Sequence, residues 1–389
     1  MDILNPFVSV ISLIVTGVGS LYTYLTYRGH KTAQAKSLTD EKVLPVDIPD
    51  KLLSLIWHYP ENGGNCVSWA VKESYVLRGW LKKAREEPGL GVAIVTTELA
   101  LNIFGENANS RIDGCITWAI ANSFSEPPFF LKGKRSDTRD SEEEVVPDFR
   151  HTLAFSIILA RTGKLKERVN EFLQYTLNHQ NAEGGWSAGQ GKTVSEVFTV
   201  LYAIEFLSVC ALDDQITETK RSIVQASRDH AMDWLILKVS GNGMWESGVF
   251  KDYVWDDLFT TAWVLYRLSQ LKYIISSKWN EVLLRSSLLM ISKVSKPTTW
   301  ERSPQLQHFR LEARVAAALA VYQSTGLLDS NGSESLLIYL SDWRRRAELF
   351  ARKISDDDWD VATAAFYLQA MFSLNDIKGR INKIGLIIS

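Results

Sequence analysis

Carboxylates stand at two places in this 389-residue chain where they could carry out acid–base chemistry. Asp256 and Asp257 directly precede one apolar stretch, and Asp358 and Asp360 precede another. An aspartic acid that burial keeps protonated can donate a proton to a substrate. Alternatively, an acid in the first turn of a helix has no role in a reaction and serves to stabilise that helix, by about 0.3–1 kcal/mol. Both interpretations stay open. The first candidate for a proton donor is Asp360, with Asp358 beside it, and the second is Asp256 or Asp257.

Aromatic side chains recur at helical spacing in several apolar stretches. Their ring faces could stabilise a positively charged intermediate, although aromatics at this spacing also form ordinary core. The candidates for lining a cavity are Phe198, Tyr202, Phe259, Trp263, Tyr266 and Phe366, and Phe206, Tyr322 and Tyr367 belong to the same pattern.

The elements that must position these residues are helices, because the 3.6-residue periodicity recurs and no convincing period-2 strand run is found. Polar, basic segments such as 165–180 alternate with segments that are apolar nearly all round, such as 194–212. A helix that faces water on one side carries the first pattern, and a helix that is buried on both sides carries the second. The alternation predicts an outer and an inner layer. The expected helices span 165–180, 194–212, 217–239, 255–271, 279–294, 311–327, 333–354 and 361–374.

Tryptophan ends the loop after each outer segment. The four tryptophans are Trp186, Trp245, Trp300 and Trp359, and the intervals between them are nearly equal. A long, regular period with one helical hairpin per unit indicates a repeat architecture. A more diverged unit precedes them, with Phe129 at the loop position. Five hairpins are clear, and a sixth would close a ring.

The loop Gln180-Asn-Ala-Glu-Gly184-Gly185-Trp186 matches the pattern Q-x-x-x-G-x-W. It resembles the QW repeat of squalene-hopene and oxidosqualene cyclases, and the next unit keeps part of it in Gly243 and Trp245. From about residue 50 onward, the chain therefore resembles the α/α toroid of terpene cyclases and protein prenyltransferase β subunits. The resemblance implies an all-α, (α/α)5-6 toroid. It also implies that Gln180, Gly184 and the four tryptophans are structural residues that clamp one hairpin to the next.

The resemblance to class II terpene cyclases further implies a D-x-D-D-T-A motif, whose central aspartic acid protonates an alkene or an epoxide. Neither acidic site completes the motif. Asp256 and Asp257 lack the first aspartate, and Val361 replaces the last acid after Asp358 and Asp360. These departures favour a divergent or non-catalytic module, with an isoprenoid-processing enzyme as the alternative. A glycan-processing toroid is a third alternative, since paired acids facing an aromatic cavity could also serve there.

The resemblance to prenyltransferases would require a zinc site built from Asp, Cys and His. Asp113, Cys115 and His151 are the one candidate set in the sequence, and the spacing of His151 does not fit that family. Cys66, Cys115 and Cys210 lie far apart, so they form neither a disulfide framework nor a CxxC metal clip. We expect no metal and no cofactor.

Residues 7–27 form an apolar run without a charged side chain, long enough as a helix to span the roughly 30 Å hydrocarbon core of a bilayer. Arg28 and Lys31 follow at once, whereas Asp2 is the charged residue before the run. The positive-inside rule predicts a single-pass protein with its N-terminus outside and the toroid in the cytoplasm. A signal peptide cleaved near residues 33–35 is the alternative, but the basic residues lie on its wrong side.

The predicted domains are an anchor (1–28), a linker (29–48) and a toroid (49–389) with a charged insertion at 131–147. The net charge of −2 excludes a strongly positive field for nucleic acid. The expected partners are the membrane, an isoprenoid or other apolar ligand, and a protein partner or a second copy of the chain. Ser12, Thr16 and Ser20 form a small-residue face that could pair two anchors. We hypothesise that the chain is a membrane-anchored, toroid-like module that binds an apolar ligand or a protein partner.

Overall fold

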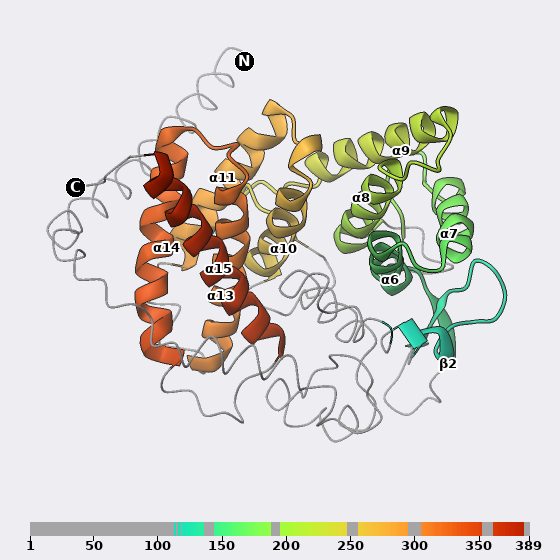
Figure 1. The fold of residues 1–389 in the computed structure, drawn as a ribbon, viewed down its shortest axis with the longest axis horizontal. Helices are drawn as coiled ribbons and strands as arrows, with labels where there is room; N and C mark the ends of the chain where they lie inside the picture. Colours follow the sequence, from blue (N-terminus) through green and yellow to red (C-terminus); the bar gives the residue numbers. More distant parts are fainter. Residues whose placement is uncertain are drawn as a thin grey trace, which may run out of the picture. The chain divides into compact units, whose positions relative to one another are not determined.

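A computed structural model describes residues 113, 116–117, 119–135, 144–187, 195–246, 256–294, 305–351 and 361–384. These residues are mostly helical, as the sequence predicts (Figure 1). Most helix ends lie within three residues of the predicted ones, but α13 begins six residues earlier and α15 ends ten residues later. The helices are α6 (Phe149–Thr162), α7 (Lys166–Asn178), α8 (Val197–Ala211), α9 (Glu218–Leu237), α10 (Asp256–Gln270), α11 (Ser277–Val294), α13 (Gln305–Ser324), α14 (Ser330–Ala351) and α15 (Val361–Ile384).

Burial differs sharply between consecutive helices. Fourteen of the fifteen residues of α8 are buried, because nearly every side chain in it is apolar. Only five of the twenty residues of α9 are buried, on the stripe that faces α8. Each buried Val, Leu, Ile or Phe contributes about 1.5–3 kcal/mol relative to exposure. The predicted alternation of fully buried and half-exposed helices is therefore confirmed in this pair.

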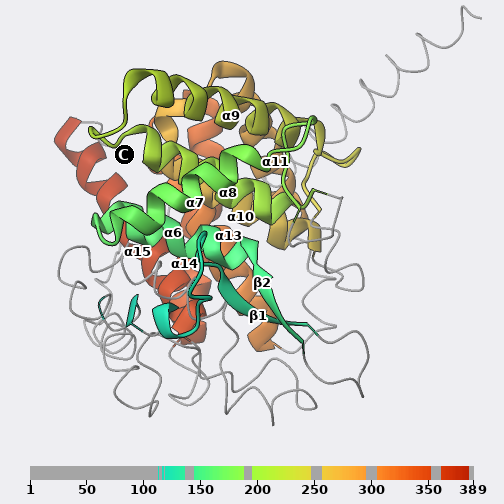
Figure 2. The same cartoon turned by 90° about the vertical axis from the view of Figure 1, so that its right-hand side faces the viewer.

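The buried helices pack on one another in series along the chain. Helix α6 contacts α8, α8 contacts α10, α10 contacts α13, and α13 contacts α15. The half-exposed helices cover this series: α7 packs on α6 and α8, α9 on α8, α11 on α10 and α13, and α14 on α11 and α13 (Figure 1 and Figure 2). The buried series is the element that positions the predicted aromatic residues.

The charged insertion contains a feature that the sequence pattern did not predict. Strands β1 (Leu131–Arg135) and β2 (Glu144–Asp148) pair antiparallel, with Leu131 opposite Asp148 and Arg135 opposite Glu144. The sequence shows no convincing strand run here, but the β-branched Val145 and Val146 favour extended backbone, which is consistent with the short strand that they form. The hydroxyl of Thr152 on α6 accepts the Leu131 N–H at 3.0 Å, which ties the hairpin to the helix.

Two tryptophan loops fall in the described residues, and both tryptophans make the same hydrogen bond. The indole N–H of Trp186 donates to the carbonyl of Thr176 at 2.8 Å, and that of Trp245 donates to the carbonyl of Leu235 at 2.8 Å. Each acceptor lies at the same distance upstream in the sequence, in the half-exposed helix that the loop follows. Both rings are almost fully buried. Trp300 and Trp359 lie outside the described residues.

The backbone of the two loops also repeats. Gly184 and Gly243 have positive φ angles of 96° and 78°, which glycine adopts readily. Their N–H groups donate to the carbonyls of Asn181 and Ser240, at 3.0 and 2.8 Å. The same turn therefore occurs twice, and the separation of the two glycines equals that of Trp186 and Trp245.

Each loop is also held by the next half-exposed helix. The amide of Gln180 donates to the Ser227 carbonyl on α9 at 2.8 Å and to the Gly184 carbonyl at 2.9 Å. In the following unit, the Ser286 hydroxyl on α11 donates to the Gly243 carbonyl at 2.8 Å. Because Ser227 and Ser286 are separated by the same repeat length as the two glycines, each loop connects equivalent points of successive hairpins.

Among the described residues, no helix is long and apolar enough to cross a membrane. The predicted anchor (1–28) and linker (29–48) lie outside the described residues. So do the segments 51–58, 67–83 and 92–104, which we expect to supply a sixth hairpin and one extra helix.

Candidate functional site

The six aromatic residues predicted to line a cavity come together between α8, α10 and α15. Trp263 stacks on Tyr266, with ring centroids 5.6 Å apart and planes 14° apart. Phe366 meets both of these rings edge-on, at 5.8 and 5.9 Å. Phe198 packs edge-on against Phe259 at 6.2 Å. We call the six residues the aromatic cluster: Phe198, Tyr202, Phe259, Trp263, Tyr266 and Phe366.

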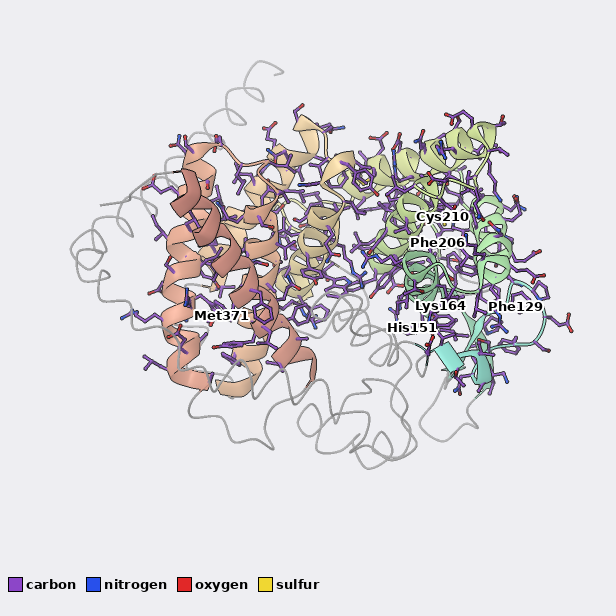
Figure 3. All side chains as sticks on the ribbon, viewed as in Figure 1. Phe129, His151, Lys164, Phe206, Cys210 and Met371 are labelled. Atoms are coloured by element: carbon purple, nitrogen blue, oxygen red, sulfur yellow. The ribbon has the colours of Figure 1, made fainter. Side chains whose placement is uncertain are left out.

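The remaining three aromatics of the same sequence pattern face the covering helices instead. Phe206, labelled on α8 in Figure 3, packs against Phe172 of α7 with ring centroids 5.7 Å apart. The Tyr322 hydroxyl is hydrogen-bonded to Asn280 of α11, and Tyr367 packs against Trp343 of α14. Helical spacing thus identified buried aromatics, and the structure separates the cluster from this outward-facing set.

Two arginines lie on the ring faces of the aromatic cluster. The Arg267 guanidinium, which is fully buried, lies 4.5 Å from the centroid of Trp263 and 4.7 Å from that of Tyr202. The Arg314 guanidinium lies 3.7 Å from the centroid of Phe259 and 4.8 Å from that of Phe366. Such contacts are worth about 0.5–2 kcal/mol each, and more where they are desolvated. The protein's own cations therefore lie over four of the six rings of the aromatic cluster, where a bound cation could otherwise sit.

A fully buried glutamate balances part of this charge. The Glu205 carboxylate on α8 accepts hydrogen bonds from Nη1 of Arg267 at 2.7 Å and from Nη2 of Arg161 at 2.6 Å. Arg161 also donates to Gln270 at 3.2 Å. A buried ion pair contributes little net stability, but removing one partner is costly. The Glu205 network therefore fixes how α6, α8 and α10 meet.

The sequence pattern did not single out Glu205, Arg161, Arg267 or Arg314. A signal was present, since Glu205 and Arg267 are the single charged residues within the otherwise apolar runs Val197–Ala211 and Leu258–Ser269. An isolated charge on a helix that is buried all round needs an opposite charge on a neighbouring helix. Pairing these two charges would have predicted the contact between α8 and α10.

The candidate acids differ in where the structure places them. The Asp257 carboxylate forms an ion pair with Lys293 of α11 and accepts the Leu258 N–H at 2.7 Å. This arrangement stabilises the start of α10 and leaves the carboxylate beside a lysine rather than in the aromatic cluster. Asp256 begins α10, but its side chain is not among those described, and Asp358 and Asp360 lie outside the described residues.

Two further acids begin buried helices, and both serve local structure. Asp148 caps α6 by accepting the His151 N–H at 2.9 Å, and its second oxygen lies 2.6 Å from Nδ1 of His151. Burial opposes ionisation of Asp148, but the hydrogen bonds and charge of His151, with the charge of Arg150, hold its pKa below the ordinary value. Glu196 precedes α8 and pairs with Arg150 at 3.0 Å.

Glu312 behaves differently from the acids that begin helices. Because α13 begins at Gln305, Glu312 lies two turns inside the helix rather than at its start. Burial raises the pKa of Glu312 to about 7, against the lowering effect of Arg346 on α14, which donates to both of its carboxylate oxygens. The raised pKa suits a proton donor, but the carboxyl group is turned toward α14 and away from the rings that contact Arg314.

The residues of the zinc alternative do not assemble in the described part of the chain. Asp113 pairs with Lys164, His151 is held by Asp148, and Cys115 lies outside the described residues. No group of three or more metal-binding side chains occurs among the residues described.

No protein-family model and no curated protein sequence matches this chain.

Proposed function

We propose that this chain is a membrane-anchored helical toroid, of the kind shared by terpene cyclases and prenyltransferase β subunits, that binds a protein partner without catalysing a reaction. The serial packing of buried helices and the two equivalent tryptophan loops support the toroid. The uncharged run 7–27, followed by Arg28 and Lys31, supports an anchor that leaves the toroid in the cytoplasm.

The observation that carries the non-catalytic assignment is the position of Arg267 and Arg314 on the rings of the aromatic cluster. A carbocation intermediate would need these same ring faces. At an effective dielectric constant of about 20, a second positive charge roughly 5 Å from a guanidinium is disfavoured by about 3 kcal/mol, or over a hundredfold in rate. The negative charge of Glu205 offsets this repulsion near Arg267, but the same carboxylate also holds the Arg267 guanidinium in place. An uncharged apolar ligand would likewise have to displace two cations from the rings.

The second candidate is an isoprenoid-processing enzyme that uses Asp360, Asp358 or Asp256 as the proton donor. The gathering of six aromatic side chains between α8, α10 and α15 favours it, because such rings stabilise positive charge. Asp257 fits this role less well than the sequence pattern suggests, since its carboxylate pairs with Lys293 of α11.

Product analysis separates the two candidates. Full-length protein is incubated with squalene, oxidosqualene and geranylgeranyl diphosphate, the mixture is extracted, and products are measured by mass spectrometry, with a known cyclase as the positive control. We expect no cyclised or hydrolysed product from the wild type. A product that is lost in Asp360→Asn but kept in Asp257→Asn would overturn the proposal and establish the enzyme.

A further inference from the structure

A pocket of about 520 Å³ lies on the side of α9 that faces the segment leading into α11. The α9 residues that line the pocket recur every three or four positions, so they lie on one face of that helix. The opposite wall contains the short 3-10 helix Lys272–Ile274 and the first turn of α11. The residues that line the pocket on α9 are Gln225, Arg228, Asp229, Met232 and Asp233, and those opposite are Ala211, Leu212, Tyr273, Ile274, Ser276 and Trp279.

The pocket combines a buried apolar floor with exposed apolar side chains at its edge. Met232 and Trp279 are nearly fully buried. Leu212 and Tyr273, by contrast, are 64% and 52% exposed, which is unusual for large apolar side chains. A floor and rim of this kind can cover an apolar side chain of a partner.

Trp279 carries a hydrogen-bond donor that the described protein leaves unused. Its ring is 4% exposed and stacks on Trp245, with centroids 6.2 Å apart and planes 8° apart. The indole N–H of Trp186 and that of Trp245 donate to helix carbonyls. No hydrogen bond from the indole N–H of Trp279 occurs within the described residues, and this N–H is not one of the fully enclosed donors that lack a partner. An N–H in a nearly buried ring that lines a pocket is suited to a carbonyl acceptor supplied by a bound chain.

The charges of the pocket are predominantly acidic. Asp229 and Asp233 stand one turn apart on α9, and both are exposed. Arg228 donates both of its hydrogen bonds, at 2.9 and 2.7 Å, to the same oxygen of Asp229. The second oxygen of Asp229 is left available, and Asp233 has no ion pair within the described ranges. The pocket therefore complements a positively charged side chain.

We propose that this pocket docks a short segment of a partner protein in which a lysine or arginine neighbours an apolar side chain. The apolar side chain rests between Leu212, Met232 and Tyr273, and the basic side chain pairs with Asp229 and Asp233. A backbone carbonyl of the segment accepts the Trp279 N–H. The inference rests on the proposed function, since it names the chemistry of the partner that the module binds.

Three short synthetic peptides test the docking site on full-length protein in detergent micelles. One alternates lysine with leucine, one alternates glutamate with leucine, and one alternates lysine with serine. Binding is measured by fluorescence anisotropy at two salt concentrations, with protein-free micelles as the background. In protein labelled with ¹⁵N-tryptophan, Trp279→Phe assigns the indole signal of Trp279, whose shift then locates the bound peptide.

We expect the lysine–leucine peptide to bind at least tenfold more tightly than the other two and to shift the Trp279 signal. Exchange of both pocket acids, Asp229→Asn with Asp233→Asn, should weaken this binding about tenfold at low salt and less at high salt. Asp214→Asn, at an exposed acid outside the pocket, should leave it unchanged.

Three outcomes would each overturn the docking site. The first is that the glutamate–leucine or the lysine–serine peptide binds as tightly as the lysine–leucine peptide. The second is that binding of the lysine–leucine peptide is unchanged by the Asp229→Asn, Asp233→Asn double exchange, and the third is that it binds without a shift of the Trp279 signal. These outcomes do not depend on the product analysis. A chain that forms no isoprenoid product and fails to bind the lysine–leucine peptide refutes this site alone, whereas product formation refutes the proposed function.

Discussion

The tryptophan loops and the aromatic cluster use similar residues in opposite ways. In the loops, the indole N–H groups of Trp186 and Trp245 donate to equivalent helix carbonyls, and the arrangement repeats from one hairpin to the next. In the aromatic cluster, the ring faces of Trp263 and Phe259 meet guanidinium groups, and nothing in the arrangement repeats. The repeated contacts thus define how hairpins stack, whereas the unrepeated charges decide what the interior can accept.

The largest effect should come from removing a loop tryptophan. Trp245→Ala deletes a fully buried ring and its hydrogen bond to Leu235, which should cost about 4 kcal/mol of unfolding free energy. If the loops are mechanically equivalent, Trp186→Ala costs the same to within about 1 kcal/mol. Urea unfolding of both variants measures this. A loss in one variant that is several times the loss in the other would break the equivalence.

The next effect concerns the buried charges of the cluster. Arg267→Met leaves the Glu205 carboxylate buried with Arg161 as its remaining described partner, and should cost about 3 kcal/mol. Glu205→Leu combined with Arg267→Met should recover most of that loss, because the intact pair contributes little net stability. Arg345→Met, at an exposed arginine, is the matched control with an expected loss below about 0.5 kcal/mol.

Urea unfolding of the two single variants and the double variant completes this cycle. Losses that simply add would mean that Glu205 and Arg267 stabilise the fold independently, and that the cluster is not organised around their pairing.

Substitution of the loop glycines should show in which respect the two tryptophan loops are not equivalent. A Cβ on Gly184 would lie 2.6 Å from the backbone oxygen of His230, whereas a Cβ on Gly243 would meet the flexible end of Leu289. We expect Gly184→Ala to lower the free energy of unfolding by about 2.5 kcal/mol, and Gly243→Ala to lower it by about 1.5 kcal/mol. Gly326→Ala, with a positive φ and open space around it, reports the backbone strain alone, at about 1 kcal/mol.

Thermal and urea unfolding of the three glycine variants rank these losses. A loss at Gly243 that exceeds the loss at Gly184 would mean that the approach of α11 to its loop is tighter than the approach of α9.

The smallest effect depends on pH and involves Glu312. Its pKa of about 7 in the folded protein exceeds its ordinary value of 4.5, so between these pH values the folded state holds a proton that the unfolded state releases. Stability of the wild type should therefore fall, relative to Glu312→Gln, by roughly 1 kcal/mol as pH rises from 6 to 7. Glu348→Gln, at a half-buried acid of α14, is the control. Parallel pH profiles for wild type and Glu312→Gln would show that Glu312 does not titrate in this range.

The fold could be predicted from the sequence to the extent that its parts repeat or are periodic. The helices followed from apolar periodicity, and the tryptophan spacing identified two loops that make the same hydrogen bonds. The hairpin at Leu131–Asp148 could not be predicted this way, because its strands are short and lie in a charged stretch. Periodicity also placed the start of α13 too late, since Gln305 to Arg310 is a polar first part of a helix that becomes apolar only afterwards.

The candidate site could be predicted only in part. Spacing placed the six rings of the aromatic cluster in the same pattern as Phe206, Tyr322 and Tyr367 and gave no physical reason to divide the two sets, because helix facing depends on which neighbours pack on each side. The arginines of the cluster were missed because their partners are distant in sequence: Arg267 pairs with Glu205 of another helix. A pattern along one segment does not reveal such long-range pairs.

The most direct test of the central claim asks what occupies the ring faces of the aromatic cluster. Crystals of the full-length protein are pressurised with xenon, which enters dry apolar cavities. We predict no xenon site in contact with Trp263, Phe259 or Phe366, and guanidinium density of Arg267 and Arg314 over these rings. A well-occupied xenon site on those faces, with the two arginines turned away, would contradict the claim.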